Sequence, residues 1–270
     1  MRKTTIVFNR RQCLSLFAGA MASKLANAQV SFPTKPITII VPYTAGGASD
    51  VGARLFQNEL SKTLGQSVVI DNVSGAGGAL GVQKLLRSPA DGHTLIYGSL
   101  SECVLVPLIN PAAGYKTEDF AAIALMSTTP AALVVKPDFP ANTIEELIVY
   151  ARANPGKLNI GTPQVGTTQN LAAELFLSTA GLQAQIVPFN GTPAVLTALR
   201  GGQIDVGVEI LAPVLPQIKG QALRALAVTG DKRAAALPQV PTAKEAGVKT
   251  LYAASWNALA VPAKTPREIV

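Results

Sequence analysis

The sequence contains few of the side chains that bind metal ions or carry out nucleophilic catalysis. It has 1 histidine, His93, and 2 cysteines, Cys13 and Cys103, among 270 residues. A metal site needs a cluster of such ligands, so we expect neither a metal nor any other cofactor. A Ser-His-acid triad would have to use His93, which lies in ADGHTLIYG where we interpret it as a solvated turn residue, and no serine lies in a Gly-x-Ser-x-Gly turn. We therefore expect no enzymatic activity, and a hydrolase remains the weaker alternative.

Charged residues are also scarce, at 14% of the chain, whereas 48% of the residues are hydrophobic. This composition excludes a disordered chain. The formal net charge is +7, but 5 of the 23 Lys and Arg residues lie in residues 1–28, where there is no Asp or Glu. The remaining residues have 18 basic against 16 acidic side chains, a net charge of +2. We therefore expect no nucleic-acid partner.

Residues 1–28 have the features of an export signal. A basic segment, RKTTIVFNRRQ, precedes the short apolar segment CLSLFAGAMA and an Ala-Asn-Ala cleavage site at Ala28. The apolar segment is shorter than the ~20 residues that a membrane span requires. Arg10-Arg11 also fits a twin-arginine signal, so both export routes stay open. We predict a soluble periplasmic protein in which Cys103, left alone by cleavage, is a buried apolar side chain.

The mature chain alternates strand-like and helix-like segments. The apolar run ITIIV at 37–41 is typical of a strand buried in a parallel sheet, and short strand-to-helix connections favour right-handed crossovers. Two series of such units predict two α/β lobes joined by two crossings, with lobe 1 at 29–130, lobe 2 at 131–239 and a return crossing at 240–270. The strand-like segments are 37–41, 67–72, 93–99, 131–135, 158–162, 185–189, 204–210 and 223–230.

The loops that follow these strands are rich in Gly, Ser and Thr and contain no Lys or Arg. Ligands of such sheets bind beyond the carboxyl ends of the strands, where N–H groups at helix starts bind anions. Small residues are also what tight turns need, so each loop alone has this second explanation. The chain has no GxxxxGK[ST] phosphate loop, and GAGGALG at 75–81 lacks the last glycine of a dinucleotide fingerprint. The loops are YTAGGASD (43–50), NVSGAGG (72–78), YGSLSE (97–102), GTPQVGTTQ (161–169) and FNGTP (189–193).

Three carboxylates, Asp50, Asp205 and Glu209, are candidates for paired acid-base chemistry. Asp50 in the first turn of a helix, where it complements the helix dipole, is the simpler assignment.

Several segments together resemble the Bug-type extracytoplasmic solute receptors, the substrate-binding proteins of tripartite tricarboxylate transporters. The resemblance extends in order from about Phe32 to the end of the chain. It implies a two-lobe, type II periplasmic-binding-protein-like α/β fold, each lobe a mainly parallel sheet flanked by helices, with a small carboxylate held in the cleft between the lobes. The segments are ITIIVPYTAGGASDVGARLF, VVIDNVSGAGGALGVQKL, ADGHTLIYGS, GTTQNLAAELF, PFNGTPAVLTALRGGQIDVGVEI, ALRALAVTG and LPQVPTAKEAG.

The resemblance also implies a set of ligand-binding positions. Ala45 replaces a common Pro, Asn190 a frequent Lys and Glu209 a common Asp, so the identity of the carboxylate stays open among di- and tricarboxylates, aromatic acids and amino-acid derivatives. We expect a monomer that serves membrane transporter subunits, or alternatively a sensor kinase. The family has roughly 50 further C-terminal residues that return to the first lobe, so we expect this chain to end before those helices and to be less stable than a longer relative. The implied positions are Tyr43, Ala45, Gly46, Gly47, Asp50, Ser74, Gly75, Ser99, Gly161, Thr162, Thr167, Thr168, Asn190, Gly191, Thr192 and Asp205.

Overall fold

The computed structural model describes residues 32–270, and the predicted export signal at 1–28 lies outside them. Three parallel strands form one half of the first lobe: β1 (Ile37–Val41), β2 (Val68–Asn72) and β3 (Thr94–Ser99), with β1 between the other two. Ile39, Ile40 and Val41 are completely buried, as expected for a strand covered on both faces.

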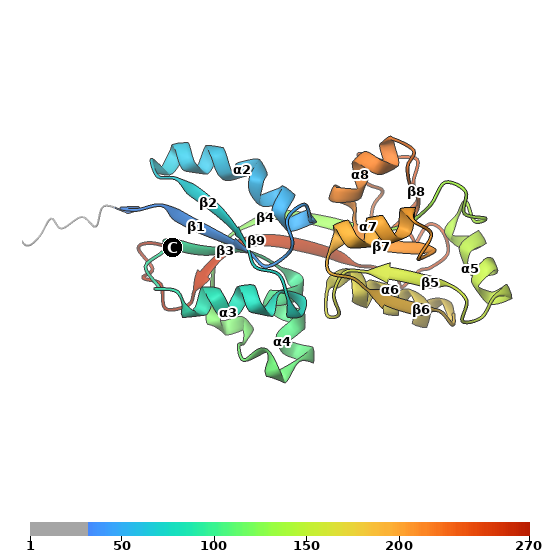
Figure 1. Cartoon of the computed structure of the whole chain (residues 1–270), viewed down its shortest axis with the longest axis horizontal. Helices are drawn as coiled ribbons and strands as arrows, with labels where there is room; N and C mark the ends of the chain where they lie inside the picture. The colour runs from blue at the N-terminus through green and yellow to red at the C-terminus, as the bar shows by residue number, and fades with distance from the viewer. Residues whose placement is uncertain (1–31) are drawn as a thin grey trace, which may run out of the picture. The chain divides into compact units, whose positions relative to one another are not determined.

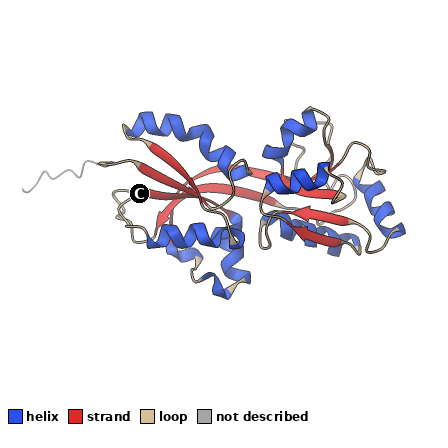
Figure 2. Cartoon of the chain, in the orientation of Figure 1, coloured by secondary structure: helices blue, strands red, loops and turns tan. Residues whose placement is uncertain are grey.

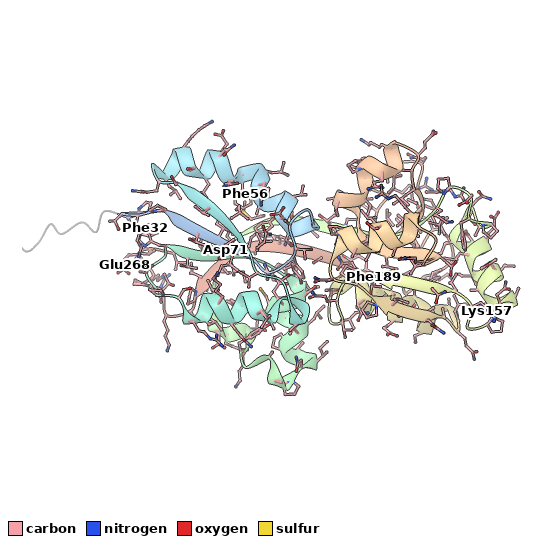
Figure 3. The ribbon with its side chains drawn as sticks, viewed as in Figure 1. Phe32, Phe56, Asp71, Lys157, Phe189 and Glu268 are labelled. Atoms are coloured by element: carbon pink, nitrogen blue, oxygen red, sulfur yellow. The ribbon has the colours of Figure 1, made fainter. Side chains whose placement is uncertain are left out.

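Two helices cover opposite faces of this sheet (Figure 1). Helix α2 (Ala48–Leu64) brings the Phe56 ring to 5.3 Å from the Tyr97 ring of β3, and the Phe56 side chain is labelled in Figure 3. Helix α3 (Ala79–Arg87) packs Val82 and Leu85 against Ile40 and Ile96. Helix α2 ends at Gly65, whose φ of 63° is the left-handed conformation of a C-cap glycine.

Short helical segments complete the first lobe after β3. A π-helical turn, η2 (Ser101–Leu105), leads directly into α4 (Val106–Ile109). The short 3₁₀ turns are η1 (Ala76–Gly78), η3 (Pro111–Ala113) and η4 (Thr117–Asp119). Turns of π geometry are rare and are found often at functional sites, and η2 begins where β3 reaches the pocket described below.

Two long antiparallel strands continue from the first lobe into the second (Figures 1 and 2). Strand β9 (Ala254–Pro262) pairs with β3 and with the first part of β4 (Phe120–Val135). The last part of β4, from Ala131, pairs instead with β7 and β8 of the second lobe. The strand that we predicted at 131–135 is the last part of β4. We did not predict the part before Ala131, because Ala122–Met126 are exposed and lack the buried pattern of the other strands.

The second lobe contains β5 (Asn159–Thr162), β6 (Gln185–Pro188), β7 (Val206–Ile210) and β8 (Arg224–Val228). Strand β5 pairs in parallel with β6 and β7, whereas β4 is antiparallel to β7 and β8. One core, centred on Phe176, Ile160 and Leu147, packs helices against one face of the sheet, and a second core includes Val195, Leu199 and Val214. The helices are α5 (Ile144–Ala153), α6 (Thr168–Ala180), α7 (Thr192–Arg200) and α8 (Leu211–Lys219).

The two-lobe α/β fold that the sequence predicts is confirmed. Cys103 is buried, also as predicted. His93 is only 8% exposed, so our interpretation of a solvated turn was wrong: its carbonyl accepts from the Thr38 N–H at 2.8 Å, which holds the residue against the start of the sheet. Among residues 32–270, no helix combines the length and apolar character needed to cross a lipid bilayer.

Candidate functional site

A small pocket lies where the first and second lobes meet, at the carboxyl ends of their parallel strands. Its cavity volume is about 40 Å³, which corresponds to roughly three water molecules. None of the 16 residues that line it carries a charge. They are Tyr43, Thr44, Gly47, Ala48, Ser49, Ser99, Ser101, Thr129, Pro163, Thr167, Gln169, Gly191, Thr192, Ile210, Ser255 and Asn257.

Three helices begin at this pocket. Gly47 is the N-cap of α2, Thr167 that of α6 and Gly191 that of α7, and all three residues line the cavity. The first N–H groups of a helix have no acceptor within the helix, and the helix dipole adds a partial positive charge there. The pocket is therefore suited to an anion although no Lys or Arg side chain lines it.

A buried carboxyl, Glu102, organises the wall of the first lobe. Its Oε2 accepts hydrogen bonds from the Tyr43 hydroxyl at 2.7 Å and from the Ser99 hydroxyl at 2.6 Å, and its Oε1 accepts from the Ser99 N–H. Glu102 is completely buried, and this burial raises its pKa even though the hydrogen bonds from Ser99 and Tyr43 favour the ionised form. Burial, together with the Glu102 charge, raises the pKa of Tyr43 as well, so Tyr43 keeps its proton.

A second buried carboxyl, Glu209, lies behind the wall of the second lobe. Its Oε2 accepts from the Thr192 hydroxyl at 2.9 Å, whereas Oε1 has no donor in hydrogen-bonding geometry. Glu209 is completely buried, and this burial raises its pKa to about 8, although Thr192 and Gln169 partly favour the ionised form. Because Thr192 and Gln169 both line the cavity, Glu209 lies directly behind the surface that a ligand would contact.

Hydrogen bonds join the two lobes around the pocket. The Ser101 hydroxyl oxygen accepts from the Thr168 N–H at 2.9 Å, and the Gly77 N–H donates to the Gln164 side chain at 3.0 Å. A Cβ added to Gly191 would lie 2.3 Å from Thr44 Oγ1. Together with the small cavity volume, these contacts describe a closed arrangement of the lobes.

The structure brings six of the positions implied by the resemblance to the pocket: Tyr43, Gly47, Ser99, Thr167, Gly191 and Thr192.

Other implied positions support these residues from just outside the cavity. The Gly46 N–H donates to Asp50 at 2.9 Å, which fixes the loop before α2, and Asp50 also pairs with Arg54 at 2.9 Å. Burial opposes ionisation of Asp50, but the hydrogen bonds from Arg54 and Gly46 lower its pKa overall. The Thr162 hydroxyl is buried and donates to the carbonyl of Pro163, which lines the pocket. Asp50 is therefore a first-turn residue, as the simpler assignment predicts.

The remaining implied positions do not line the pocket, and each has another role in the structure. Asn190 accepts from the Gln164 amide at 2.8 Å, on the part of the loop that faces solvent. Gly161 is required by packing, since a Cβ there would lie 2.1 Å from Ile204. Ala45 is exposed, and Ser74 and Gly75 lie in the half-buried loop before η1.

Asp205 lies away from the pocket, at the other end of the second-lobe sheet. Its carboxylate accepts from the Asn159 N–H at 2.8 Å, where β5 and β7 begin, whereas the pocket lies where these parallel strands end. The structure therefore does not place Asp205 among the residues that a ligand in this pocket would contact.

Ten lining residues are not among the positions implied by the resemblance. Six of them nevertheless lie in loops that we singled out from the sequence: Thr44, Ala48, Ser49, Ser101, Pro163 and Gln169. Thr129, Ser255 and Asn257 come from β4 and β9, whose antiparallel pairing across the two lobes has no local signature. The last of the ten is Ile210, at the end of β7.

Comparison with known proteins identifies the family. Residues 52–270 match the sequence model of one protein family, TctC, which is described as the tripartite tricarboxylate transporter family receptor. The chain belongs to this family. The resemblance noted in the sequence is therefore confirmed, and receptors of this family are periplasmic solute-binding proteins.

Two proteins of known sequence are similar to this chain over most of its length. A UPF0065 protein from the TAR-I ttuE-ttuC' intergenic region of Agrobacterium vitis is 34% identical over 97% of this chain and 75% of its own length. Protein BugT of Bordetella pertussis is 34% identical over 89% of this chain and 74% of its own length.

Solved structures agree in fold. Rpa4515 of R. palustris with adipate has a TM-score of 0.85 and 36% identity, covering 88% of this chain and 80% of that protein. MatC of Rhodopseudomonas palustris with bound malate has a TM-score of 0.83 and 31% identity, covering 88% and 81%. The periplasmic binding protein BugD has a TM-score of 0.84 and 29% identity, covering 88% and 80%.

Proposed function

We propose that this chain is a periplasmic receptor that captures a small organic carboxylate between its lobes and delivers it to the membrane subunits of a tripartite tricarboxylate-type transporter. The observation that carries the proposal is the convergence of three helix N-termini on one uncharged pocket. Similar proteins hold adipate and malate, which supports a carboxylate as the ligand class.

The proposed capture relies on both lobes. Ala48 and Ser49 supply N–H groups from α2, whereas the Gly47 N–H already donates to the Thr44 carbonyl at 3.3 Å. Gln169 at the start of α6 and Thr192 at the start of α7 supply N–H groups from the opposite side. A ligand that bridges both sets stabilises the closed arrangement, because only that arrangement brings the sets together. Binding and closure are then coupled without any catalytic step, and release requires no strong Arg–carboxylate pair to be broken.

The first test is native mass spectrometry of the purified protein, followed by thermal shifts with a panel of mono-, di- and tricarboxylic acids. We expect one class of acid to co-purify or to raise the melting temperature by several degrees. If no acid is retained and none shifts the melt, the carboxylate proposal is wrong.

A charge placed in the pocket tests the location. Ser49→Asp adds a carboxylate at the start of α2, where it competes with the ligand for the same N–H groups, so we expect the thermal shift to disappear. Asn58→Asp adds the same charge on the exposed side of α2 and serves as the control. A ligand-induced shift that survives Ser49→Asp would place the anion elsewhere.

A further inference from the structure

A carboxyl group on strand β7 reaches the pocket only through another residue. Glu209 does not line the cavity, but its Oε2 lies 2.9 Å from the hydroxyl oxygen of Thr192, which does. Thr192 is the first residue of α7, where the proposed function places the carboxylate of the ligand. The charge state of Glu209 therefore acts at the part of the pocket that would bind the anion.

Glu209 is neutral in the folded protein below about pH 8. It is completely buried, and this burial raises its pKa to about 8. Its Oε1 has no hydrogen-bond partner, and among the ion pairs of residues 32–270 none involves Glu209. A buried carboxyl that has no cationic partner keeps its proton, because loss of solvation penalises the charged form.

The elements packed around β7 bring no charge to Glu209. Strand β7 contacts β4, β5, α6, α7 and α8, and the charged residues within the bounds of these elements are Glu174, Arg200 and Lys219. All three are exposed, whereas Glu209 is buried. Asp205, which precedes β7, lies at the other end of the sheet, where it bonds to a backbone N–H.

The groups closest to Glu209 are polar and uncharged. From the second lobe, the Thr192 hydroxyl and the Gln169 amide face it. From the first lobe, Tyr43 lines the opposite wall with Glu102 behind it, and these two side chains bond to each other at 2.7 Å. Burial raises the pKa of both, so neither adds a charge near Glu209 when each keeps its proton.

The hydrogen bond between Thr192 and Glu209 reverses when the carboxyl carries its proton on Oε2. Only Oε2 has a hydrogen-bond partner, so a proton on Oε2 forms a bond, whereas a proton on Oε1 forms none. A proton on Oε2 is donated to the threonine oxygen, which leaves the threonine hydrogen free for an acceptor in the cavity. Ionised Glu209 has no hydrogen, so the Thr192 hydroxyl donates to it and offers only lone pairs to a ligand.

From this arrangement we infer that Glu209 is a positioning residue for anion capture: its proton makes the Thr192 hydroxyl a donor to the carboxylate of the ligand, and its ionisation weakens binding. The inference rests on the proposed carboxylate-binding function and adds a proton dependence to it. Ionisation has two effects of the same sign, because it removes one donor from the pocket and places a negative charge behind the start of α7.

The expected pH dependence of affinity lies in a different range from that of stability. Below about pH 8 the folded protein holds Glu209 neutral, so the affinity should stay nearly constant. A bound anion raises the pKa of Glu209 further, so above about pH 8 binding takes up a proton and the affinity falls by at most about tenfold per pH unit. Folding stability is lost at lower pH, where the unfolded chain ionises this residue and the folded chain does not.

Isothermal titration between about pH 7 and 9.5 tests the inference on the unmodified protein, with malate, succinate and adipate as probes. The carboxyl groups of these acids are ionised throughout this range, so their own titration does not contribute. For a probe that binds, we expect the affinity to fall by at least about tenfold between pH 7 and 9.5. Titrations at about pH 8.5 in two buffers of different ionisation enthalpy should show net proton uptake.

A variant assigns this pH dependence to one residue. In Glu209→Gln the amide can donate to Thr192 at every pH, as the protonated acid does. The pH dependence should disappear, and at about pH 9.5 the variant should bind the probe at least about tenfold more tightly than the unmodified protein. A purely structural role for Glu209 predicts no such gain. Glu174→Gln removes an exposed carboxylate from α6 and should keep the pH profile of the unmodified protein.

The outcomes separate this inference from the proposed function. If the affinity stays constant from pH 7 to 9.5, the inference is wrong and the carboxylate receptor stands. If the affinity falls equally in Glu209→Gln, another group such as Glu102 is responsible and the inference is wrong. If Glu209→Gln does not fold, the absence of proton uptake by the unmodified protein overturns the inference. If no carboxylic acid binds at any pH, the proposed function fails and the inference fails with it.

Discussion

The two lobes each place one fully buried glutamate behind the pocket, and the two glutamates are bonded differently. Glu102 in the first lobe receives hydrogen bonds from two hydroxyls and one backbone N–H. Glu209 in the second lobe receives one from Thr192, and its Oε1 lacks a donor in good geometry. Glu102 therefore maintains the shape of its wall, whereas Glu209 has unused capacity to accept a hydrogen bond.

The local backbone explains part of this difference. Glu102 lies in the π-helical turn η2, only three residues after Ser99, so its side chain folds back onto the end of β3. Glu209 lies within β7, and its carboxyl reaches the start of α7 from the strand below. Glu102 therefore accepts from the Ser99 N–H as well as from two hydroxyls, whereas Glu209 depends mainly on the Thr192 hydroxyl.

The largest expected effect concerns the pH dependence of stability caused by Glu209. Burial raises its pKa to about 8 from the usual 4.5, so the fold favours the neutral acid. The stability of the fold with Glu209 neutral is fully present below about pH 4.5. Part of that stability is lost as the pH rises toward 8, because the unfolded chain then ionises Glu209 and the folded chain does not. The free energy of unfolding should fall by at most ~1.4 kcal/mol per pH unit in that window, or up to about 4 kcal/mol between pH 5 and 8.

Urea denaturation of the ligand-free protein at several pH values measures this slope. The pKa of Glu102 is raised as well, so its contribution has the same sign. The difference between the unmodified protein and Glu209→Gln isolates Glu209, because Gln does not titrate. If the free energy of unfolding changes with pH in the same way in both proteins, ionisation of Glu209 does not destabilise the fold and the prediction is wrong.

Removal of Glu102 should have the next largest effect. Glu102→Ala leaves the hydroxyls of Tyr43 and Ser99 and the Ser99 N–H without their acceptor in a buried region. We expect the free energy of unfolding to fall by about 3 kcal/mol, as for other broken buried networks. Glu118→Ala, at an exposed position of the same lobe, should change it by less than about 0.5 kcal/mol. A loss below about 1 kcal/mol for Glu102→Ala would contradict the structural role.

A substitution at Gly191 should weaken closure of the lobes while both glutamates stay unchanged. Gly191 has a φ of 90°, and a Cβ there would lie 2.3 Å from Thr44 Oγ1 on the opposite lobe. Gly191→Ala should therefore hold the lobes apart and weaken ligand binding by at least about tenfold, measured by isothermal titration.

The matched control is Gly156→Ala. Gly156 has a φ of 74° and open space around its Cβ position, so it shares the backbone strain but not the clash. Both variants should lose about 1 kcal/mol of stability, and only Gly191→Ala should lose affinity. Equal affinities would mean that Thr44 and Gly191 do not meet in the ligand-bound form.

The sequence predicted those features of the fold and site that depend on a short stretch of neighbouring residues, and not those that depend on packing between distant segments. The buried parallel strands were found because their apolar runs are continuous, and ITIIV coincides with β1. Helix α8 is not evident in the sequence, because Pro213 and Pro216 in LAPVLPQIK are typical of a loop. Glu209 was considered as one of a carboxylate pair, but its burial depends on α7 packing over β7, which no short segment reveals.

The smallest expected effect tests a position that the resemblance assigned to ligand binding. Asp205 accepts from the Asn159 N–H at 2.8 Å at the end of the sheet away from the pocket. Asp205→Asn weakens this one hydrogen bond, so we expect about 1 kcal/mol less stability and no change in ligand affinity. Thr192→Val, on the pocket itself, should lower both affinity and stability, because it removes a lining hydroxyl and its hydrogen bond to the buried Glu209. A loss of affinity in Asp205→Asn of more than about threefold would show that the amino-terminal end of the sheet is coupled to the pocket, since ~0.6 kcal/mol would then be transmitted along β5 or β7.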